Sequence, residues 1–245
     1  MGRSAIFVYG VVAYAVSMVT ILYSIGFVGN LLVPKTINSG QPGALGVSIA
    51  VNLALLSVFA VQHSLMARPG FKQVWTKIIP KPAERSTYLL MACGALALIF
   101  VFWQPLPIPV WDLRGTFVGS VLIGHFWVGW LIVLTSTFMI DHFDLFGLKQ
   151  IYANLKSRQA LPSGFIKVGL YRLVRHPIMT GFMIAFWATP FMTVGHLLFA
   201  AVTTIYIVIA VLHLEEKDLI AEIGEDYLDY RRDVPAFVPG FGRGQ

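Results

Sequence analysis

An uncharged run near the C-terminal end limits the folds open to this chain. From Ile178 to Leu214 the sequence contains no Lys, Arg, Asp or Glu. A helix crosses a bilayer with about 20 apolar residues, so the run is too long for one straight crossing. Pro190 and Gly195 interrupt it, which leaves two interpretations. The run is either one kinked span or a hairpin that turns near residues 189–195 and has a short first arm.

Four further apolar runs are long enough to cross a membrane. Only 12% of the 245 residues are charged, whereas soluble domains carry about 25%. We therefore predict an all-α, polytopic bundle of five to six membrane helices in one domain over residues 1–245, with N-terminal spans in 1–115 and a core in 116–245. The first run exceeds the about 7–15 residues of a signal peptide's apolar region, so we expect it to be retained. The four runs are Ala5–Val33, Ala44–Ala67, Ser86–Trp103 and Thr116–Ile140.

Basic residues decide between the two interpretations, because Lys and Arg collect in cytoplasmic loops. With a hairpin, 16 of the 18 basic residues share one side and only Lys35 and Arg114 lie on the other. With a kinked span the split is 12 to 6. The hairpin is favoured, with both termini cytoplasmic. This topology explains the net charge of +6 without a nucleic-acid partner, and we expect the bilayer, but no obligate protein partner.

Two stretches are amphipathic rather than spanning. Apolar side chains recur at helical spacing over residues 145–155 and again over residues 219–230, with charged residues between them. Such a pattern is typical of a helix that lies in the membrane interface.

The dense polar clusters all fall on the predicted cytoplasmic side, which indicates a site at that membrane surface. Five clusters stand out: Gln62-His63-Ser64 with Arg68, Glu84-Arg85-Ser86 with Tyr88, Asp141-His142, Tyr171-Arg172 with Arg175-His176-Pro177, and Glu215-Glu216.

The fourth cluster is suited to an anion. Pro177 fits the first position of a helix and favours an extended His176. The helix start then offers free amides to a carboxylate or phosphate, and Arg175 adds positive charge. An alternative is that these arginines contact lipid headgroups. Glu215 and Glu216 could accept hydrogen bonds from a diol or an amine, or could simply end a helix in solvent.

Three strings in the last third of the chain resemble the isoprenylcysteine carboxyl methyltransferase and phospholipid methyltransferase superfamily. The superfamily pattern is RHPxYxG, EExxL and FGxxYxxYxxxVP, and the chain departs from it at Met179 and Ile223. The strings are Arg175-His-Pro-Ile-Met-Thr-Gly181, Glu215-Glu-Lys-Asp-Leu219 and Gly224-Glu-Asp-Tyr-Leu-Asp-Tyr-Arg-Arg-Asp-Val-Pro235.

Upstream strings resemble, more narrowly, the bacterial methanethiol S-methyltransferases. With them the resemblance extends over most of residues 60–240. They are Gln62-His-Ser-Leu-Met-Ala-Arg-Pro-Gly-Phe-Lys72, Glu84-Arg-Ser-Thr-Tyr88, Ser136-Thr-Phe-Met-Ile-Asp-His-Phe-Asp-Leu-Phe-Gly147 and Ala188-Thr-Pro-Phe-Met-Thr-Val-Gly-His196.

The resemblance implies S-adenosylmethionine as methyl donor and a small thiol as acceptor, at the cytoplasmic face of a bacterial inner membrane. The products would be dimethyl sulfide and S-adenosylhomocysteine. No metal is implied. The donor would be bound by Tyr171, Arg175, His176, Pro177, Met179, Gly181, Glu215 and Glu216.

The acceptor thiol has to be ionised before it attacks, because the thiolate is the nucleophile. A base or a positive field would help, and Tyr171 could also offer a cation–π face to the sulfonium. The sequence does not choose among the catalytic candidates. They are His63, Glu84, Arg85, Asp141, His142 and Tyr171.

Two other functions stay open at this point. One is the same chemistry on a prenylcysteine carboxylate or a phospholipid amine. The other is a non-enzymatic membrane protein, a haem-handling or transport accessory that uses histidines such as His63, His125 and His196.

Overall fold

The computed structural model describes residues 2–159, 164 and 167–241. Its long elements are helices, and five helical segments are long and apolar enough to cross a membrane. This confirms the predicted all-α polytopic architecture, with helix boundaries within a few residues of the predicted runs. The long helices are α1 (Arg3–Gly29), α2 (Leu45–Ala67), α4 (Glu84–Phe102), α5 (Phe117–Ile140) and α9 (Val194–Ala210).

The chain divides into two compact units, and neither is one continuous stretch. The N-terminal unit comprises Met1–Pro107 and Asp141–Ser163, and the C-terminal unit comprises Ile108–Ile140 and Gly164–Gln245.

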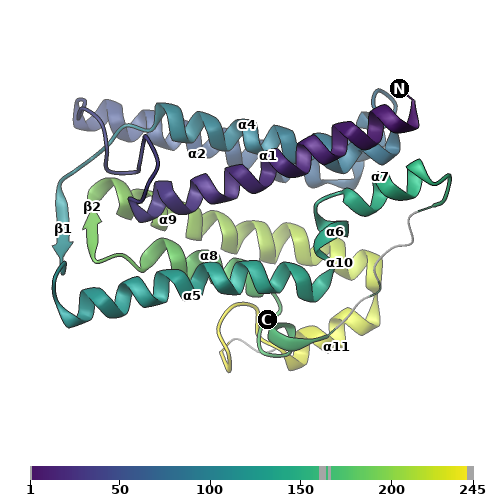
Figure 1. The fold of residues 1–245 in the computed structure, drawn as a ribbon. Helices are drawn as coiled ribbons and strands as arrows, with labels where there is room; N and C mark the ends of the chain where they lie inside the picture. Colours follow the sequence, from purple (N-terminus) through teal and green to yellow (C-terminus); the bar gives the residue numbers. More distant parts are fainter. Residues whose placement is uncertain (1, 160–163, 165–166, 242–245) are drawn as a thin grey trace. The chain divides into compact units, whose positions relative to one another are not determined.

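In the N-terminal unit, α4 packs against both α1 and α2 (Figure 1). A cluster of Ile6, Ala83 and Ile151 is buried where α1 meets the shorter elements. The stretch expected at the interface contains a short helix, and its buried Ile151 faces α1. The shorter elements are α3 (Pro69–Trp75), η1 (Lys81–Ala83), α6 (His142–Leu145) and α7 (Leu148–Leu155).

In the C-terminal unit the uncharged run forms the predicted hairpin. Helix α8 (Pro177–Trp187) lies along α5, and the chain then turns through strand β2 (Phe191–Thr193) into α9 (Figure 1). Strand β2 pairs antiparallel with β1 (Pro109–Asp112). With 11 residues, α8 is about 16 Å long, so this arm is short, as expected.

The tail continues from α9 through three further helical elements. The π-helix η3 (Val211–Glu215) leads into α10 (Glu216–Ile223), and α11 (Glu225–Asp233) follows. The amphipathic stretch predicted over residues 219–230 is therefore two helices rather than one. They are separated by Gly224, whose φ of 77° favours glycine.

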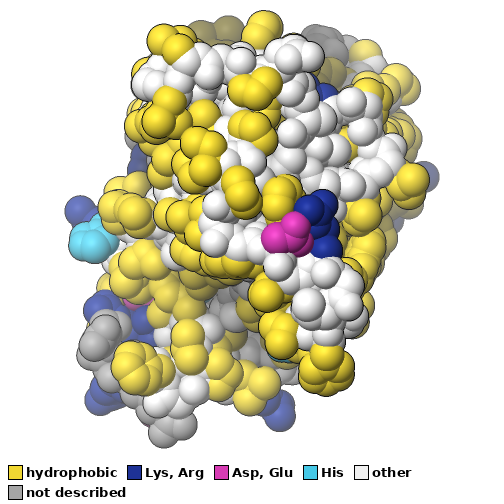
Figure 2. Space-filling view, turned by 90° about the vertical axis from the view of Figure 1, so that its left-hand side faces the viewer, with side chains coloured by type: hydrophobic (Ala, Val, Ile, Leu, Met, Phe, Trp, Pro, Cys, Tyr) yellow, Lys and Arg dark blue, Asp and Glu magenta, His cyan; other side chains and the backbone are white. Residues whose placement is uncertain are grey.

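Much of the side-chain surface of the long helices is apolar. Val12, Leu131 and Ile205 are each more than half exposed. Figure 2 views the side on which β1 and β2 lie in Figure 1, and hydrophobic side chains are scattered over that face as well. Such a surface is typical of helices that contact lipid tails rather than water.

Helices α5 and α8 approach closely at two glycines. A Cβ on Gly129 would lie 2.7 Å from the Gly181 carbonyl oxygen, and a Cβ on Gly181 would lie 2.6 Å from the Gly129 carbonyl oxygen. Small residues permit this kind of backbone approach between membrane helices. Gly181, predicted from the resemblance to contact the donor, therefore has a packing role.

We expect Gly129→Ala to lower the stability of the C-terminal unit by about 1–3 kcal/mol, because the added methyl group meets backbone atoms that cannot rotate away. Gly124→Ala is the matched control, since it lies in the same helix and its Cβ would meet nothing within 4 Å. Thermal unfolding in detergent compares the two variants. Equal melting temperatures would contradict the close contact between α5 and α8.

Candidate functional site

The Arg-His-Pro segment forms the entry to α8 within the C-terminal unit. Pro177 occupies the first turn of α8, as the sequence predicts. His176 precedes it with φ −124° and ψ 63°, which lies outside the extended region predicted for it. A short 3-10 turn, η2 (Gly169–Arg172), leads into the segment. Gly169 has a φ of +51°, and a Cβ there would press on the Met139 side chain.

The π-helix η3 sets the direction of the Glu-Glu pair. The helical segment continues without a break from Val194 to Ile223, and η3 ends at Glu215. A π-turn holds an extra residue, so it rotates everything after it relative to a regular α-helix. In this register Glu216 is turned into the protein and Glu215 is not.

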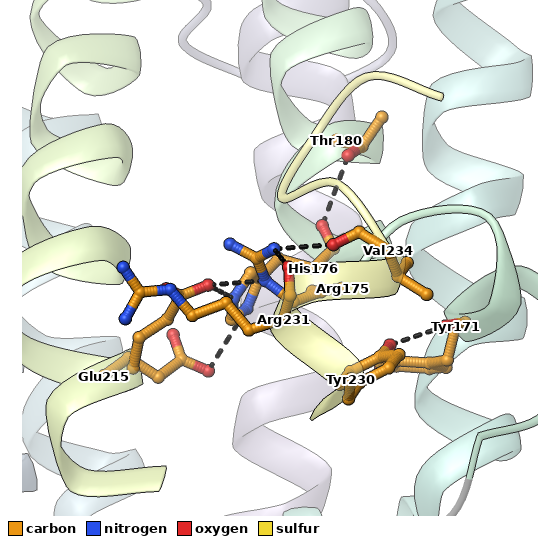
Figure 3. Close-up of polar contacts among 9 residues, drawn as sticks. Tyr171, Arg175, His176, Thr180, Glu215, Tyr230, Arg231 and Val234 are labelled. Atoms are coloured by element: carbon orange, nitrogen blue, oxygen red, sulfur yellow. Dashed lines mark hydrogen bonds and ion pairs between the residues drawn. The ribbon is translucent and has the colours of Figure 1, made fainter. Parts of the chain in front are cut away.

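Glu216 lies at the centre of a buried charged network, and its partners Arg175, His176 and Arg231 are labelled in Figure 3. Its Oε1 is 2.7 Å from Arg175 Nε and 3.1 Å from His176 Nε2. Its Oε2 is 3.6 Å from Arg231 Nε. The side chains of Arg175 and Glu216 are 0% and 2% exposed. Charges buried to this extent persist only when they are paired and hydrogen-bonded, and both conditions hold here.

The Val-Pro end of the tail covers the same segment. We call residues 234–237 the C-terminal strap. Arg175 Nη1 donates to the carbonyls of Arg231 (2.9 Å) and Val234 (2.5 Å). The amides of Arg175 and His176 donate to the carbonyls of Pro235 and Ala236, at 2.8 and 3.0 Å. Thr180 Oγ1 adds a bond of 2.8 Å to the Phe237 carbonyl. Backbone and side-chain hydrogen bonds thus join the Arg-His-Pro segment to the strap.

Glu215 differs sharply from its neighbour. Its side chain is 45% exposed, and its Oε1 lies 3.7 Å from His176 Nδ1, which is too long for a hydrogen bond. The two carboxylates were equivalent in the sequence. In the structure Glu216 contacts the protein interior, and Glu215 keeps an accessible carboxylate beside His176.

Two groups of Tyr171, its backbone carbonyl and its side-chain hydroxyl, contact neighbouring residues. Its carbonyl accepts a hydrogen bond of 2.5 Å from Tyr230 Oη, and its own hydroxyl lies 3.5 Å from the Ser136 carbonyl. Burial, with further contributions from Tyr230 and Glu215, holds the pKa of the Tyr171 hydroxyl well above its usual range. Met179, the third residue of α8, is half-buried.

The other predicted catalytic residues lie in the N-terminal unit, in two groups. His63, near the end of α2, meets Tyr88 of α4, with the Tyr88 hydroxyl 3.0 Å from either ring nitrogen. The Arg85 guanidinium lies 5.7 Å from the centre of the Tyr88 ring. Arg85 Nε also donates to the Leu145 carbonyl at 2.8 Å. Glu84 is the first residue of α4.

The second group surrounds the start of α6. The Asp141 side chain caps the helix by accepting from the Asp144 amide at 3.0 Å and also bonds Lys149 Nζ at 2.9 Å. His142 is 4% exposed, and its Nε2 lies 3.0 Å from the Tyr14 hydroxyl. Burial lowers the pKa of His142, with Asp141 partly opposing that shift.

Sequence reasoning did not single out Thr180, Tyr230 or Arg231, whose bonds hold the buried network together. Thr180 sits inside the Arg-His-Pro string, and the other two sit in the Tyr-Arg-Arg-Asp-Val-Pro string. The regular spacing of that second string was the available signal. Its partners could not be named without the fold.

Comparison with known proteins gives several close relatives. The chain is 53% identical to methanethiol S-methyltransferase 2 of Bradyrhizobium diazoefficiens, over 97% of this chain and 91% of the relative. It is 50% identical to methanethiol S-methyltransferase of Mycobacterium tuberculosis, over 98% of each chain. It is 45% identical to the Crocosphaera subtropica enzyme of the same name, over 99% of this chain and 95% of the relative.

A more distant similarity connects the chain to a eukaryotic membrane protein. Nurim of Rattus norvegicus is 32% identical, over 73% of this chain and 71% of its own length. No family model and no solved structure matches the chain. The bacterial relatives match it over nearly their whole length and share one name. The chain belongs to the methanethiol S-methyltransferase family of membrane methyltransferases.

Proposed function

We propose that this protein transfers a methyl group from S-adenosylmethionine to methanethiol, producing dimethyl sulfide and S-adenosylhomocysteine. The observation that carries the proposal is the identity of 45–53% over nearly the full length to bacterial enzymes named methanethiol S-methyltransferase. It favours a small thiol over a prenylcysteine carboxylate, over a phospholipid amine and over a haem-handling role.

The chemistry of the α8 entry suits an adenosyl donor. Glu215 supplies an accessible carboxylate that can accept from a ribose diol or from the donor's ammonium group. Half-buried Met179 supplies apolar surface for an adenine. When bound, the donor provides an electrophilic methyl group on a sulfonium.

In this proposal Arg175 and Glu216 position other residues of the site and do not contact the donor themselves. Both side chains are buried and bonded to each other, so their contribution is to fix His176 and the strap. A donor carboxylate would contact the start of α8 after Pro177, where helix geometry leaves amides unbonded by the helix itself. The ring of Tyr171 remains the candidate for the sulfonium, because its raised pKa leaves no phenolate to act as a base.

For methyl transfer the protein mainly has to align the thiolate with the methyl group of the donor. The thiolate attacks the methyl carbon in line with the departing donor sulfur, and fixed positioning supplies most of the rate. We place the reaction at the cytoplasmic face of a bacterial inner membrane, with both termini in the cytoplasm. The basic loops support this side. A small apolar thiol can reach such a site through the bilayer.

A competition among acceptors tests the proposal. The purified protein is incubated with donor labelled in its methyl group, together with methanethiol, a prenylcysteine and an aminophospholipid. We expect the label to appear in dimethyl sulfide. Label in lipid or in prenylcysteine ester, with none in dimethyl sulfide, would reject methanethiol as the acceptor. A Soret band together with no donor binding would favour the haem-handling role.

A further inference from the structure

A surface cavity of about 350 Å³ lies within the C-terminal unit, between α11 and the helical segment that carries the Glu-Glu pair. We call it the α10–α11 cavity. Glu215 is not one of its lining residues, so the cavity differs from the accessible carboxylate proposed for the donor. All of its lining residues belong to the C-terminal unit, and they are Leu212, His213, Glu216, Lys217, Ile220 and Arg231.

The walls of the α10–α11 cavity carry more positive than negative charge. Lys217 is exposed, and no described residue forms an ion pair with it. The Arg231 side chain is 35% exposed. Glu216, the one acidic residue of the lining, already belongs to the buried network. The other acidic residues of α10, Asp218 and Glu222, do not line the cavity. An anion that enters it would therefore meet a net positive charge.

Helix length places the cavity at the depth of lipid headgroups. The helical segment Val194–Ile223 contains 30 residues and follows strand β2 directly. About 20 residues cross the hydrocarbon core. Counted from Val194, the segment leaves the core near Leu214, which is also the last residue of the uncharged run. Lys217 lies about 5 Å beyond that level, within the polar layer of about 5–8 Å that headgroups add on each side.

The chemistry of the walls fits the phosphate end of a phospholipid. A guanidinium such as that of Arg231 can bond two phosphate oxygens at once, and the Lys217 ammonium adds a point charge. The His213 ring can donate a further hydrogen bond. Leu212 and Ile220 offer apolar surface to the glycerol and the first acyl carbons, which a soluble phosphate would leave in contact with water.

We infer that the α10–α11 cavity binds the phosphate group of an anionic phospholipid such as phosphatidylglycerol. Lys217 and Arg231 pair with the phosphate, and the acyl chains continue into the bilayer along the apolar surface of the span. A choline headgroup would bring another cation to these walls, so a lipid with a net negative charge is preferred. The inference does not rest on the proposed function, because it involves neither the methyl donor nor the thiol.

Native mass spectrometry of the full-length protein in detergent tests the inference, because it counts bound lipids and gives their Kd. The probes are phosphatidylglycerol and phosphatidylcholine with the same acyl chains. We expect one phosphatidylglycerol to bind at least about 5-fold more tightly than phosphatidylcholine. Lys217→Gln should weaken phosphatidylglycerol binding about 5-fold, the usual contribution of one basic side chain at an anionic membrane surface. Lys217→Arg keeps the charge and should keep the affinity.

Arg232→Gln is the matched control, since it removes the same charge from an exposed residue that does not line the cavity. It should bind phosphatidylglycerol as the wild type does. Equal binding of the two lipids, wild-type affinity in Lys217→Gln, or an equal loss in Arg232→Gln would overturn the inference.

Two competitors separate the possible sources of the anion. Neither millimolar inorganic phosphate nor S-adenosylhomocysteine should displace the bound phosphatidylglycerol. Displacement by inorganic phosphate would assign the cavity to a soluble anion, and displacement by S-adenosylhomocysteine would assign it to the methyl donor. Either result would overturn the assignment to a lipid.

Discussion

Replacing Glu216 with alanine should destabilise the C-terminal unit by about 3–5 kcal/mol. The substitution removes the carboxylate that Arg175 contacts at 2.7 Å in an environment where neither side chain is more than 2% exposed. Breaking a buried ion pair by deleting one partner leaves the other charge in a medium that solvates it poorly. The same carboxylate contacts His176 and Arg231, so the strap should loosen as well.

Thermal or denaturant unfolding in detergent measures this effect, and Glu215→Ala is the matched control. Glu215 precedes Glu216 directly, has the same chemistry and is 45% exposed. Its loss should change the melting temperature little, since exposed ion pairs contribute at most about 1 kcal/mol. A Glu216→Ala variant that unfolds at the temperature of the wild type would show that the buried network does not stabilise the unit.

Replacing Glu215 with glutamine should weaken binding of the methyl donor with little loss of stability. A hydrogen bond to a charged group contributes about 1.5–3 kcal/mol, which corresponds to roughly 10- to 150-fold in Kd. Glutamine keeps the size of the side chain and removes its charge. Calorimetric titration with S-adenosylmethionine and with S-adenosylhomocysteine measures both affinities.

The result divides the two glutamates by role. If Glu215→Gln bound the donor as tightly as the wild type, the accessible carboxylate would have no part in donor recognition. The proposal that Glu216 positions and Glu215 binds would then have to be abandoned.

The hairpin of the C-terminal unit was predictable because the positions of the charged residues can be read directly from the sequence. The uncharged run 178–214 had to begin and end at the same membrane surface to keep 16 of the 18 basic residues together. That reasoning brought the Arg-His-Pro and Glu-Glu segments to one end of the unit, and the bond between Arg175 and Glu216 agrees with it.

The sequence did not show which of the two adjacent glutamates, Glu215 or Glu216, pairs with Arg175. Adjacent glutamates on a regular helix differ by about 100° in direction, and nothing in their sequence says which one faces inward. The π-helix η3 decides this, and a π-turn depends on the packing of the finished helix rather than on the local residues. The Val-Pro string was likewise recognisable as a motif, but its contacts were not predictable. Its carbonyls accept from the backbone amides of Arg175 and His176, and every residue type except proline offers such an amide.

In the N-terminal unit the sequence named the right residue types without their partners. His63 and Tyr88 are 25 residues apart in the chain, and Tyr14 and His142 are 128 apart. Only the packing of α4 against α2 and of α1 against its neighbours identifies these pairs. Exposure then distinguishes the two histidines, and helical periodicity could not supply that difference.

Isotope labelling can follow the methyl group from the donor to the thiol. Purified protein in liposomes is given methanethiol and S-adenosylmethionine whose methyl group carries three deuterium atoms, and the headspace gas is analysed by mass spectrometry. We expect dimethyl sulfide that contains one deuterated and one ordinary methyl group, in an amount equal to the S-adenosylhomocysteine formed. S-adenosylhomocysteine without deuterated dimethyl sulfide, or deuterium in the lipid, would contradict it.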